Sequence, residues 1–363
     1  NSRDCMDCSY IYEKGERLYE ITDSRTSYEC QYGKFLKDCS SCYYCYDCRG
    51  CNNCFMSTNL RGKSYVFRNK QYTREEYLQK MAEHELSSFV ARRDLEKEFA
   101  EMMLEEAIHR YAISERIINS VGSLILNCKN VQNAFDVDGA EDSRNVYATT
   151  YIKDSMDLYH VGLDTELTYE CQGCTRVSNC QFCHLCYDNM NVMYCDTCQN
   201  SQNLFGCISV KKGEYMIFNK KYSKADYLML KEKIIGHMKK TGEYGEFFPP
   251  QIAPVYYNET QGNLYMPMEK AEVLAKGWHW EENLGGTFGK ETIASDKIPD
   301  KIEDVSDSYL REIFACTECS KNYNITQNEL LFYRREKIPL PRKCPNCRYK
   351  RRFNLRPPRK LWH

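Results

Sequence analysis

The chain has 363 residues, of which 22 are cysteine, and its formal net charge is −1. This length is enough for two or three domains with a sizeable core. No apolar run reaches the eighteen or so residues of a membrane-spanning helix, so we expect neither such a helix nor a membrane partner. The charge is uneven: from Arg334 to His363 twelve basic residues accompany one acidic residue, which gives +11 there and −12 over residues 1–333.

Residues 130–207 repeat a short pattern. Seven segments begin at residues 130, 142, 154, 164, 176, 188 and 200, and most have a polar corner followed by an apolar or aromatic stretch. Asn and Asp tolerate the left-handed backbone of tight corners, and apolar stretches favour strands, so the pattern predicts a parallel β-solenoid. We expect about 24 residues per coil, because twelve would leave little room for inward aromatic side chains. When the segments are aligned, their last positions form one column, which consists of Val137, Thr149, Val161, Cys171, Cys183, Cys195 and Cys207.

The amino-terminal part of the chain repeats the same theme. KSYVFRNKQYTREEYL from Lys63 parallels GEYMIFNKKYSKADYL from Gly213, which indicates an internal duplication. Each copy ends in a strand and a helix start, with Thr73 and Ser223 as the expected N-caps. The chain begins at Asn1 already inside the repeat, so we expect a fragment of a longer protein.

These patterns predict a mainly β fold with an α insert. The expected order is a first Cys-rich β-solenoid block (1–72), a helical insert (73–118), a second β-solenoid block (119–222), a helix with an aromatic and Pro-rich connector (223–312), and a zinc ribbon with a basic tail (313–363). Two helices should occupy the insert, with a break near Ser87 and Ser88. A short helix is expected near residues 269–276.

Two CxxC pairs lie near the carboxyl end. Cys316 and Cys319 are separated from Cys344 and Cys347 by 24 residues, with room for a helical turn from Gln327 to Arg335. Four thiolates from two knuckles match the tetrahedral, closed coordination of a structural Zn²⁺ site. The sequence therefore predicts a zinc ribbon that is structural and not catalytic. Such thiols persist in a reducing compartment, so we expect a cytoplasmic protein.

The segment after the ribbon is basic and aromatic. The candidate nucleic-acid-binding residues are Arg348, Lys350, Arg351, Arg352, Phe353, Arg356, Arg359 and Lys360. Cations neutralise phosphates and aromatic rings stack on unpaired bases, so RNA or a ribonucleoprotein is one expected partner. The alternative is that this tail packs on the acidic remainder of the chain. A protein partner also stays open.

The remaining cysteines allow three interpretations. They fill a narrow core as small apolar residues, which we favour, or they form disulfides, or they bind further metal. Disulfides along a column are awkward because neighbouring parallel strands hold the side chains too far apart. The candidates for further metal are Cys39, Cys42, Cys45, Cys48, Cys51, Cys54, Cys180, Cys183, His184 and Cys186.

Acidic residues gather at the corners of the second block. They are Asp136, Asp138, Glu141, Asp142, Asp154, Asp157 and Asp164. Paired carboxylates in a solenoid groove could hydrolyse a glycan, but corner geometry alone also accounts for them. We therefore predict a non-enzymatic scaffold or interaction protein. An enzyme acting on a glycan or another polymer and a thiol-based metal-binding protein are the alternatives.

Several motifs carry a resemblance over nearly the whole chain. They are the NKxYS helix start at Asn219, the Cys-rich triplets, EYGEFFPPQIAPVYYNET from Glu243 and PLPRKCPNCRYKRR from Pro339. With these motifs the chain resembles a group of uncharacterised cysteine-rich zinc-ribbon proteins predicted in candidate-phylum bacteria. The resemblance implies further ribbon-like segments beyond both ends, and it does not imply any particular activity. Some members carry a CoA-transferase family label, which no residue here supports.

Overall fold

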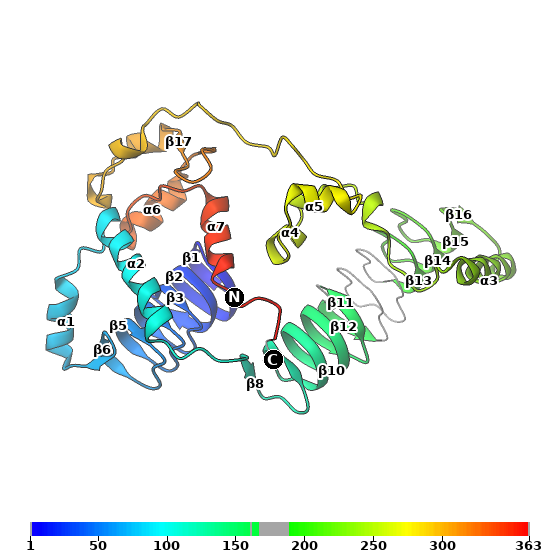
Figure 1. The fold of residues 1–363 in the computed structure, drawn as a ribbon, viewed down its shortest axis with the longest axis horizontal. Helices are drawn as coiled ribbons and strands as arrows, with labels where there is room; N and C mark the ends of the chain where they lie inside the picture. Colours follow the sequence, from blue (N-terminus) through cyan, green and yellow to red (C-terminus); the bar gives the residue numbers. More distant parts are fainter. Residues whose placement is uncertain (1, 160–161, 167–188, 362–363) are drawn as a thin grey trace. The chain divides into compact units, whose positions relative to one another are not determined.

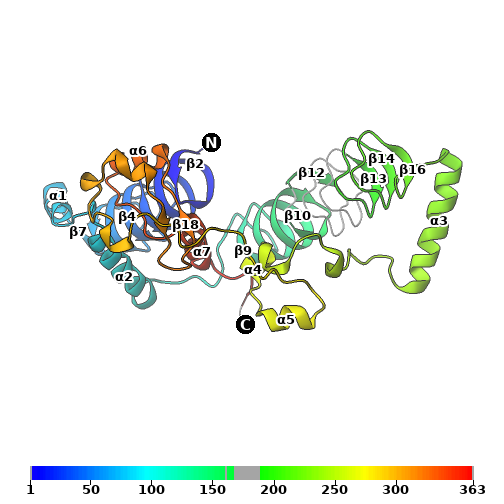
Figure 2. The same cartoon turned by 90° about the horizontal axis from the view of Figure 1, so that it is seen from above.

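The computed structural model describes residues 2–159, 162–166 and 189–361, with only the backbone described over 162–166. The chain divides into two compact units (Figure 1, Figure 2). Unit 1 comprises Asn1–His109, Gln261–Pro267 and Glu281–Pro358, and unit 2 comprises Arg110–Thr260, Met268–Trp280 and Arg359–His363. The fold is mainly β with helical insertions, as predicted. Within the described ranges, no helix is long and apolar enough to span a bilayer.

Unit 1 contains one sheet whose strands pair in chain order (Figure 1). The strands are β1 (Ser2–Met6), β2 (Ser9–Tyr28), β3 (Gln31–Lys34), β4 (Ser40–Tyr46), β5 (Asn52–Thr58), β6 (Ser64–Phe67) and β7 (Lys70–Gln71). The pairings from β1 to β6 are parallel, and β7 turns back antiparallel on β6. Gln31 pairs with Tyr43 and Asn52 pairs with Ser64, so the ladder advances by twelve residues.

The backbone explains this twelve-residue register. Positive φ angles recur at every third residue, as at Asp38 (53°), Ser41 (48°), Tyr44 (53°) and Asp47 (47°). Each left-handed residue turns the chain, and after twelve residues the chain lies beside its own earlier strand. The expectation of 24 residues per coil is therefore wrong, because the parallel register is twelve. It assumed inward aromatic side chains, whereas these side chains lie on the outer face of the ladder.

Two separate clusters form on the unit 1 ladder. The inward cluster consists of residues that are at most 2% exposed, namely Leu18, Ile21, Cys30, Leu36, Cys39, Cys42, Cys45, Cys48, Cys51, Cys54 and Val66. The outer cluster contains Tyr44 and Phe55 and is covered by Tyr77, Leu95 and Phe99. Small inward side chains allow a narrow ladder, and the covering helices bury the aromatic side chains outside it.

The covering residues come from two helices, α1 (Arg74–Ala82) and α2 (Phe89–Glu105). Thr73 caps α1 and forms a capping box with Glu76, and Ser88 caps α2. Both helices and the break between them are confirmed where the sequence predicted them. The reason is local, because Ser and Thr accept the unpaired N–H groups of a first helical turn.

Unit 2 contains two more groups of strands. They are β8 (Ser114–Glu115), β9 (Val121–Leu126), β10 (Lys129–Lys153), β11 (Met156–Tyr159) and β12 (Gly162–Glu166), and then β13 (Met190–Met193), β14 (Gln202–Phe205), β15 (Glu214–Ile217) and β16 (Lys220–Lys221). Parallel pairing again advances by twelve residues, as between Arg144 and Met156 and between Met190 and Gln202. Of the predicted closing column, Val137, Thr149, Cys195 and Cys207 are buried, and Val161, Cys171 and Cys183 lie outside the described residues.

The remaining elements follow the ladders. Unit 2 also holds α3 (Lys224–Thr241), η1 (Pro250–Ile252), η2 (Tyr257–Glu259) and α5 (Lys270–Ala275). Unit 1 also holds α4 (Gly262–Tyr265), η3 (Ser295–Lys297), η4 (Ile302–Asp304), η5 (Asp307–Arg311), β17 (Phe314–Ala315), β18 (Asn322–Tyr323), α6 (Gln327–Arg335) and α7 (Pro345–Asn354). The short helices predicted near residues 269–276 and 327–335 are confirmed as α5 and α6.

Candidate metal centre

The four predicted ligands belong to two turns of unit 1. Cys316 and Cys319 follow β17, where the Cys316 N–H donates to the Lys321 carbonyl (2.9 Å) in the hairpin with β18. Cys344 is the N-cap of α7, and Cys347 lies in its first turn. Pro345 suits the first position of a helix because it has no N–H to leave unpaired. Local turn chemistry therefore positions both pairs.

The thiols converge. The four sulfur atoms all lie within 4.8 Å of one another, and the Sγ atoms of Cys319 and Cys344 are 3.7 Å apart. Four sulfurs about 2.3 Å from a central ion would be separated by about 3.8 Å. Three of the ligands are buried and Cys319 is partly buried. This tetracysteine group fits a metal site, and it is the only such group of His, Cys, Asp or Glu in the described part of the chain.

The thiols of this group differ in acidity. Burial opposes ionisation of Cys316, but main-chain hydrogen bonds from Cys344, Cys319 and Glu318 outweigh it and lower the pKa to about 7. Burial and the neighbouring thiols raise the pKa of Cys347. One thiolate forms readily, and further negative charge on the same group is opposed by the first.

Helix α7 continues from the metal-binding turn to acidic residues of the unit 1 ladder. Arg348 pairs with Asp7 (2.9 Å), and Arg352 pairs with Asp7 (3.3 Å) and Glu20 (3.2 Å). Arg351 pairs with Glu20 (2.7 Å) and also with Glu96 of α2. The side chains of Arg348, Arg352, Asp7 and Glu20 are each at most 7% exposed. We call these six residues the α7 charge network.

Within the α7 charge network three arginines face three carboxylates, and Glu329 also pairs with Arg348 at 3.8 Å. Burial raises the pKa of Glu20, while Arg351 and Arg352 oppose that rise. Burying an ion is costly unless it is paired, so each member depends on the others. Beyond α7, Arg356 pairs with Asp23 (2.9 Å) and lies over the ring of Tyr10.

The predicted nucleic-acid-binding residues are therefore mostly engaged within the protein. Arg348, Arg351, Arg352 and Arg356 pair with acids of unit 1, as described above. Phe353 is 7% exposed and packs against Tyr265, with ring centroids 4.8 Å apart. In unit 2, Arg359 pairs with Asp136 (3.0 Å). Lys350 and Lys360 are exposed. This arrangement agrees with the alternative given by the sequence, in which the basic tail packs on acidic residues of the same chain.

The sequence did not predict the acidic residues that form ion pairs with these arginines. Asp7, Glu20 and Asp23 all occupy left-handed corners, with φ of 50°, 53° and 51°. Asp is common at such corners, so its presence there attracts no notice. Glu20 gives no better signal, because Glu13 and Glu29 also occupy left-handed positions, with φ of 66° and 53°.

The candidate cysteines of the first block lie inside the ladder. Each of Cys39, Cys42, Cys45, Cys48, Cys51 and Cys54 donates its thiol hydrogen to the carbonyl two residues earlier, at 3.3–3.6 Å. No disulfide joins the cysteines that the structure describes. These cysteines therefore fill the core of the ladder as small apolar residues, which is the interpretation that we favoured. Cys180, Cys183, His184 and Cys186 lie outside the described residues.

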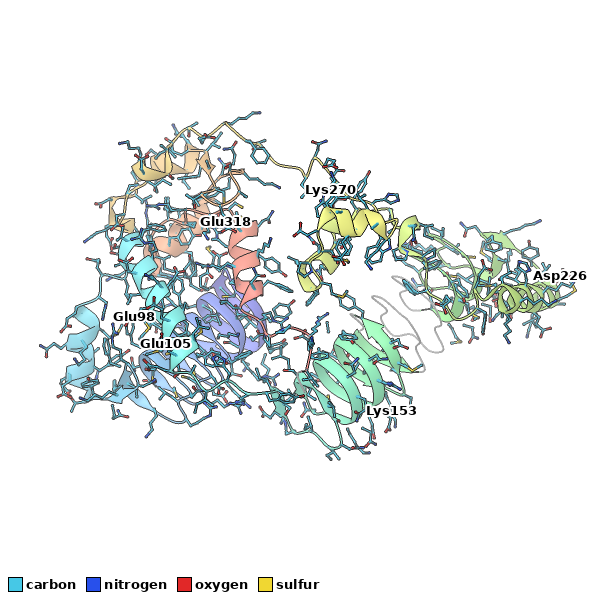
Figure 3. All side chains as sticks on the ribbon, viewed as in Figure 1. Glu98, Glu105, Lys153, Asp226, Lys270 and Glu318 are labelled. Atoms are coloured by element: carbon cyan, nitrogen blue, oxygen red, sulfur yellow. The ribbon has the colours of Figure 1, made fainter. Side chains whose placement is uncertain are left out.

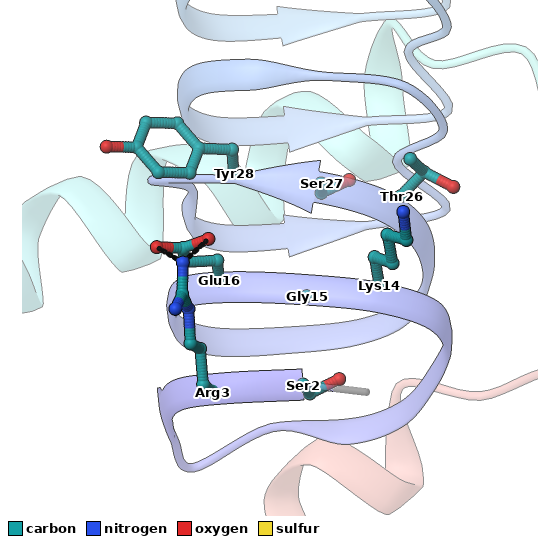
Figure 4. Close-up of a pocket in the computed structure, with 8 residues that line it drawn as sticks. All are labelled: Ser2, Arg3, Lys14, Gly15, Glu16, Thr26, Ser27 and Tyr28. Atoms are coloured by element: carbon teal, nitrogen blue, oxygen red, sulfur yellow. Dashed lines mark hydrogen bonds and ion pairs between the residues drawn. The ribbon is translucent and has the colours of Figure 1, made fainter.

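The corner acids of the second block accept hydrogen bonds from neighbouring corners. Asn130 donates to Asp142 (2.8 Å) and Asn145 donates to Asp157 (2.6 Å). Asp142 and Asp154 also line a groove of about 410 Å³ in unit 2. A larger groove of about 510 Å³ in unit 1 has Glu16 as its acid, and Glu16 pairs with Arg3 at 3.0 Å (Figure 4). The unit 1 groove thus lacks the carboxylate pair of a glycosidase.

The fold and the site define a mainly β, cysteine-rich protein with a tetracysteine group that fits a metal. No family model and no curated protein matches this chain. Among solved structures, a protein from Desulfovibrio desulfuricans G20 labelled an acetyltransferase is 11% identical, with a TM-score of 0.09. The match covers 59% of this chain and 52% of that one, and at this TM-score it carries no argument about fold or function.

Proposed function

We propose that this protein is a non-enzymatic scaffold in which a structural zinc ion holds the carboxyl-terminal ribbon on a β-solenoid. The observation that carries the proposal is the continuity of α7. Its first turn supplies Cys347, and the next residue, Arg348, enters the α7 charge network. A metal bound by the four thiols would therefore orient the helix whose arginines neutralise Asp7 and Glu20.

The proposed solenoid has support from the ladders of both units. Parallel pairing at a twelve-residue step, left-handed corners at every third residue and a continuous inward cluster are what stacked coils require. Such a scaffold offers a long surface and has no need of a reaction centre. Its terminal coils need caps, which the β6–β7 and β15–β16 hairpins would supply.

Zinc is the proposed metal because four thiolates in a closed tetrahedron suit it, and no ligand position is left for a substrate. Iron also binds four thiolates in this geometry and is the competing metal. Reduced thiols in the ladder and the ribbon agree with a cytoplasmic protein. The resemblance to cysteine-rich zinc-ribbon proteins belongs to the same proposal.

Elemental analysis of the purified chain tests the metal directly. We expect one zinc per chain in the native protein and none in Cys344→Ser/Cys347→Ser. A matched control is Cys45→Ser/Cys48→Ser, which removes two ladder thiols and should keep the zinc. Iron in place of zinc, or a full equivalent of zinc in the Cys344→Ser/Cys347→Ser protein, would contradict the assignment. Several metals per chain that fall in the control would favour thiol-based metal binding by the ladder.

RNA contact through the ribbon is a weaker part of the proposal, because its arginines already pair with acids. Lys350 and Lys360 are the exposed lysines of this segment, so they provide the test. Lys350→Gln/Lys360→Gln should weaken RNA binding if the tail contributes. Unchanged binding would remove the ribbon from the interface.

An enzyme acting on a glycan is the second candidate, favoured by the unit 2 groove that holds both Asp142 and Asp154. Two carboxylates at neighbouring ladder positions are the minimum for glycoside hydrolysis. Asp142→Asn and Asp154→Asn should each abolish such an activity while the protein stays folded. Absence of hydrolysis over a panel of polysaccharides would remove this candidate.

A further inference from the structure

The last strands of the two ladders form matching caps. In unit 1, β6 and β7 pair antiparallel through Val66 and Gln71, and in unit 2, β15 and β16 pair through Met216 and Lys221. Each cap leads to an N-capped helix, at Thr73 and Ser223, which are 150 residues apart. Residues of the two caps can therefore be compared at that offset.

The cap of unit 1 neutralises its arginines internally. Arg61 pairs with Asp47 at 2.8 Å. Arg68 pairs with Glu98, which is labelled on α2 in Figure 3. Both pairs use acids supplied by unit 1 itself, one from the preceding ladder step and one from the covering helix. Arg61 and Arg68 are therefore both neutralised within unit 1.

The cap of unit 2 has lost both pairs. Lys211 stands where unit 1 has Arg61, and Thr197 replaces Asp47 and hydrogen-bonds to Ser209 (3.0 Å). Phe218 stands where unit 1 has Arg68. The change leaves a lysine without its acid and an aromatic ring in place of a paired arginine.

Positive charge accumulates on the unit 2 cap. Residues 208–241 contain nine lysines and three acids, a balance of +6, whereas residues 58–91 of the unit 1 cap contain six basic and four acidic residues, a balance of +2. Two of those three acids are engaged, because Glu214 accepts from Gln202 (2.8 Å) and Asp226, labelled in Figure 3, bonds to Ser223 (2.7 Å). The third, Glu232, is exposed on α3. Across the described ranges, no carboxylate forms an ion pair with the exposed lysines Lys211, Lys212, Lys220 and Lys221.

Phe218 supplies an aromatic platform beside these lysines. Its side chain is 67% exposed, although the ring lies directly on Gly206. Gly206 has φ of +62°, and a Cβ there would lie 2.5 Å from the ring, so only glycine permits this contact. The next residue, Asn219, hydrogen-bonds to both main-chain groups of Ile208 at 2.9 Å. These bonds join the turn carrying Phe218 to the segment carrying Lys211 and Lys212.

We propose that this cap, consisting of Lys211, Lys212, Phe218, Lys220 and Lys221, binds single-stranded nucleic acid. Lysines without a carboxylate partner attract phosphates, and an exposed ring backed by Gly206 can stack on an unpaired base. An acidic protein or an anionic membrane would use the lysines but would not need the ring. The inference goes beyond the scaffold proposal and assigns the contact to residues other than those of the arginine-rich tail.

The test is fluorescence anisotropy with the full-length chain and a labelled twelve-nucleotide oligouridine over a range of salt concentrations. We expect Lys211→Gln/Lys212→Gln/Lys220→Gln/Lys221→Gln to lower the slope of log affinity against log salt by about 3, because each phosphate contact contributes about 0.7. Phe218→Ala should weaken binding by about tenfold at fixed salt. Circular dichroism confirms that both variants remain folded.

Matched controls make the result decisive. Lys63→Gln/Lys70→Gln removes two exposed lysines from the unit 1 cap and should leave affinity and slope unchanged. Equal loss in this control would show a general charge effect and overturn the proposal. So would an unchanged salt slope in the quadruple variant. If the lysine variant loses binding but Phe218→Ala does not, the surface recognises polyanions without stacking, and the nucleic-acid assignment is wrong. Binding of an acidic peptide or anionic vesicles without binding of the oligouridine would also overturn it.

Discussion

Replacing Arg352 by methionine tests whether buried charge pairing holds α7 on the unit 1 ladder. Arg352 is 4% exposed and pairs with Asp7 at 3.3 Å and with Glu20 at 3.2 Å. Methionine preserves much of the side-chain volume but leaves three carboxylates facing two arginines. Removing one partner of a buried ion pair costs about 3–5 kcal/mol, because the other charge stays desolvated. We expect Arg352→Met to lower the free energy of unfolding by that amount.

The matched control is Arg3→Met. Arg3 pairs with Glu16 at 3.0 Å (Figure 4), but the two side chains are 76% and 37% exposed. Exposed pairs contribute little to stability because solvent screens them, so this variant should be nearly neutral. Urea denaturation of the metal-loaded chain, followed by circular dichroism, gives both values. Equal small losses in the two variants would show that buried charge pairing does not hold α7 on the ladder, because burial would then make no difference.

A second replacement separates charge balance from lost packing. Arg352→Met/Glu20→Gln removes one cation and one carboxylate from the α7 charge network, so the double variant should be more stable than the sum of the single losses predicts. The defect of Arg352→Met should also shrink as the pH falls. Burial already raises the pKa of Glu20, and losing an arginine raises it further, so protonation relieves the unpaired charge. A loss that is independent of pH and strictly additive would point to packing alone.

Two further predictions concern single side chains of the unit 1 ladder. Burial lowers the pKa of Lys34 from 10.5 to about 8. The cost of burying its charged form therefore destabilises the fold fully below pH 8, and this cost disappears as the pH rises towards 10.5. Wild type should therefore gain up to about 3 kcal/mol relative to Lys34→Met over that interval, measured as a difference in unfolding free energy. Cys45→Ser should cost less than about 1.5 kcal/mol in the same assay. Its ladder neighbour Ser57 already makes the equivalent bond, from Oγ to the Phe55 carbonyl at 2.8 Å, and a larger loss would show that the thiol has another role.

Periodicity predicted the ladders but not their width. The twelve-residue spacing of the segments is the pairing register itself, as between Arg144 and Met156. What the spacing does not contain is the direction of each side chain. Tyr44 and Cys45 are neighbours in sequence, yet Tyr44 packs under α2 and Cys45 lies inside the ladder. Left-handed corners at every third residue decide this, and only Asn, Asp and Gly announce such corners by residue type.

The sequence predicted the cysteine ligands of the metal centre, but it did not predict which acids pair with the arginines of α7. The CxxC pairs are local, so Cys316 and Cys344 were identifiable from spacing alone. The partners of the arginines are not local, because Asp7 and Arg348 are 341 positions apart and no periodicity links them. Net charge did indicate that the basic tail had an acidic surface available within the same chain. Which acids would be buried depends on how α7 docks, and spacing carries no information about docking.

Metal and charge should act on α7 as one unit. Cys347 and Arg348 are adjacent, and Arg348 and Arg352 are four residues apart, so one helix face presents both arginines to Asp7. Without metal the first turn of α7 loses its anchor, and the α7 charge network should weaken with it. Chelation should therefore destabilise wild type more than Arg352→Met, in which part of the network is already gone. Equal losses on chelation in the two proteins would show that the metal and the arginines stabilise the fold independently.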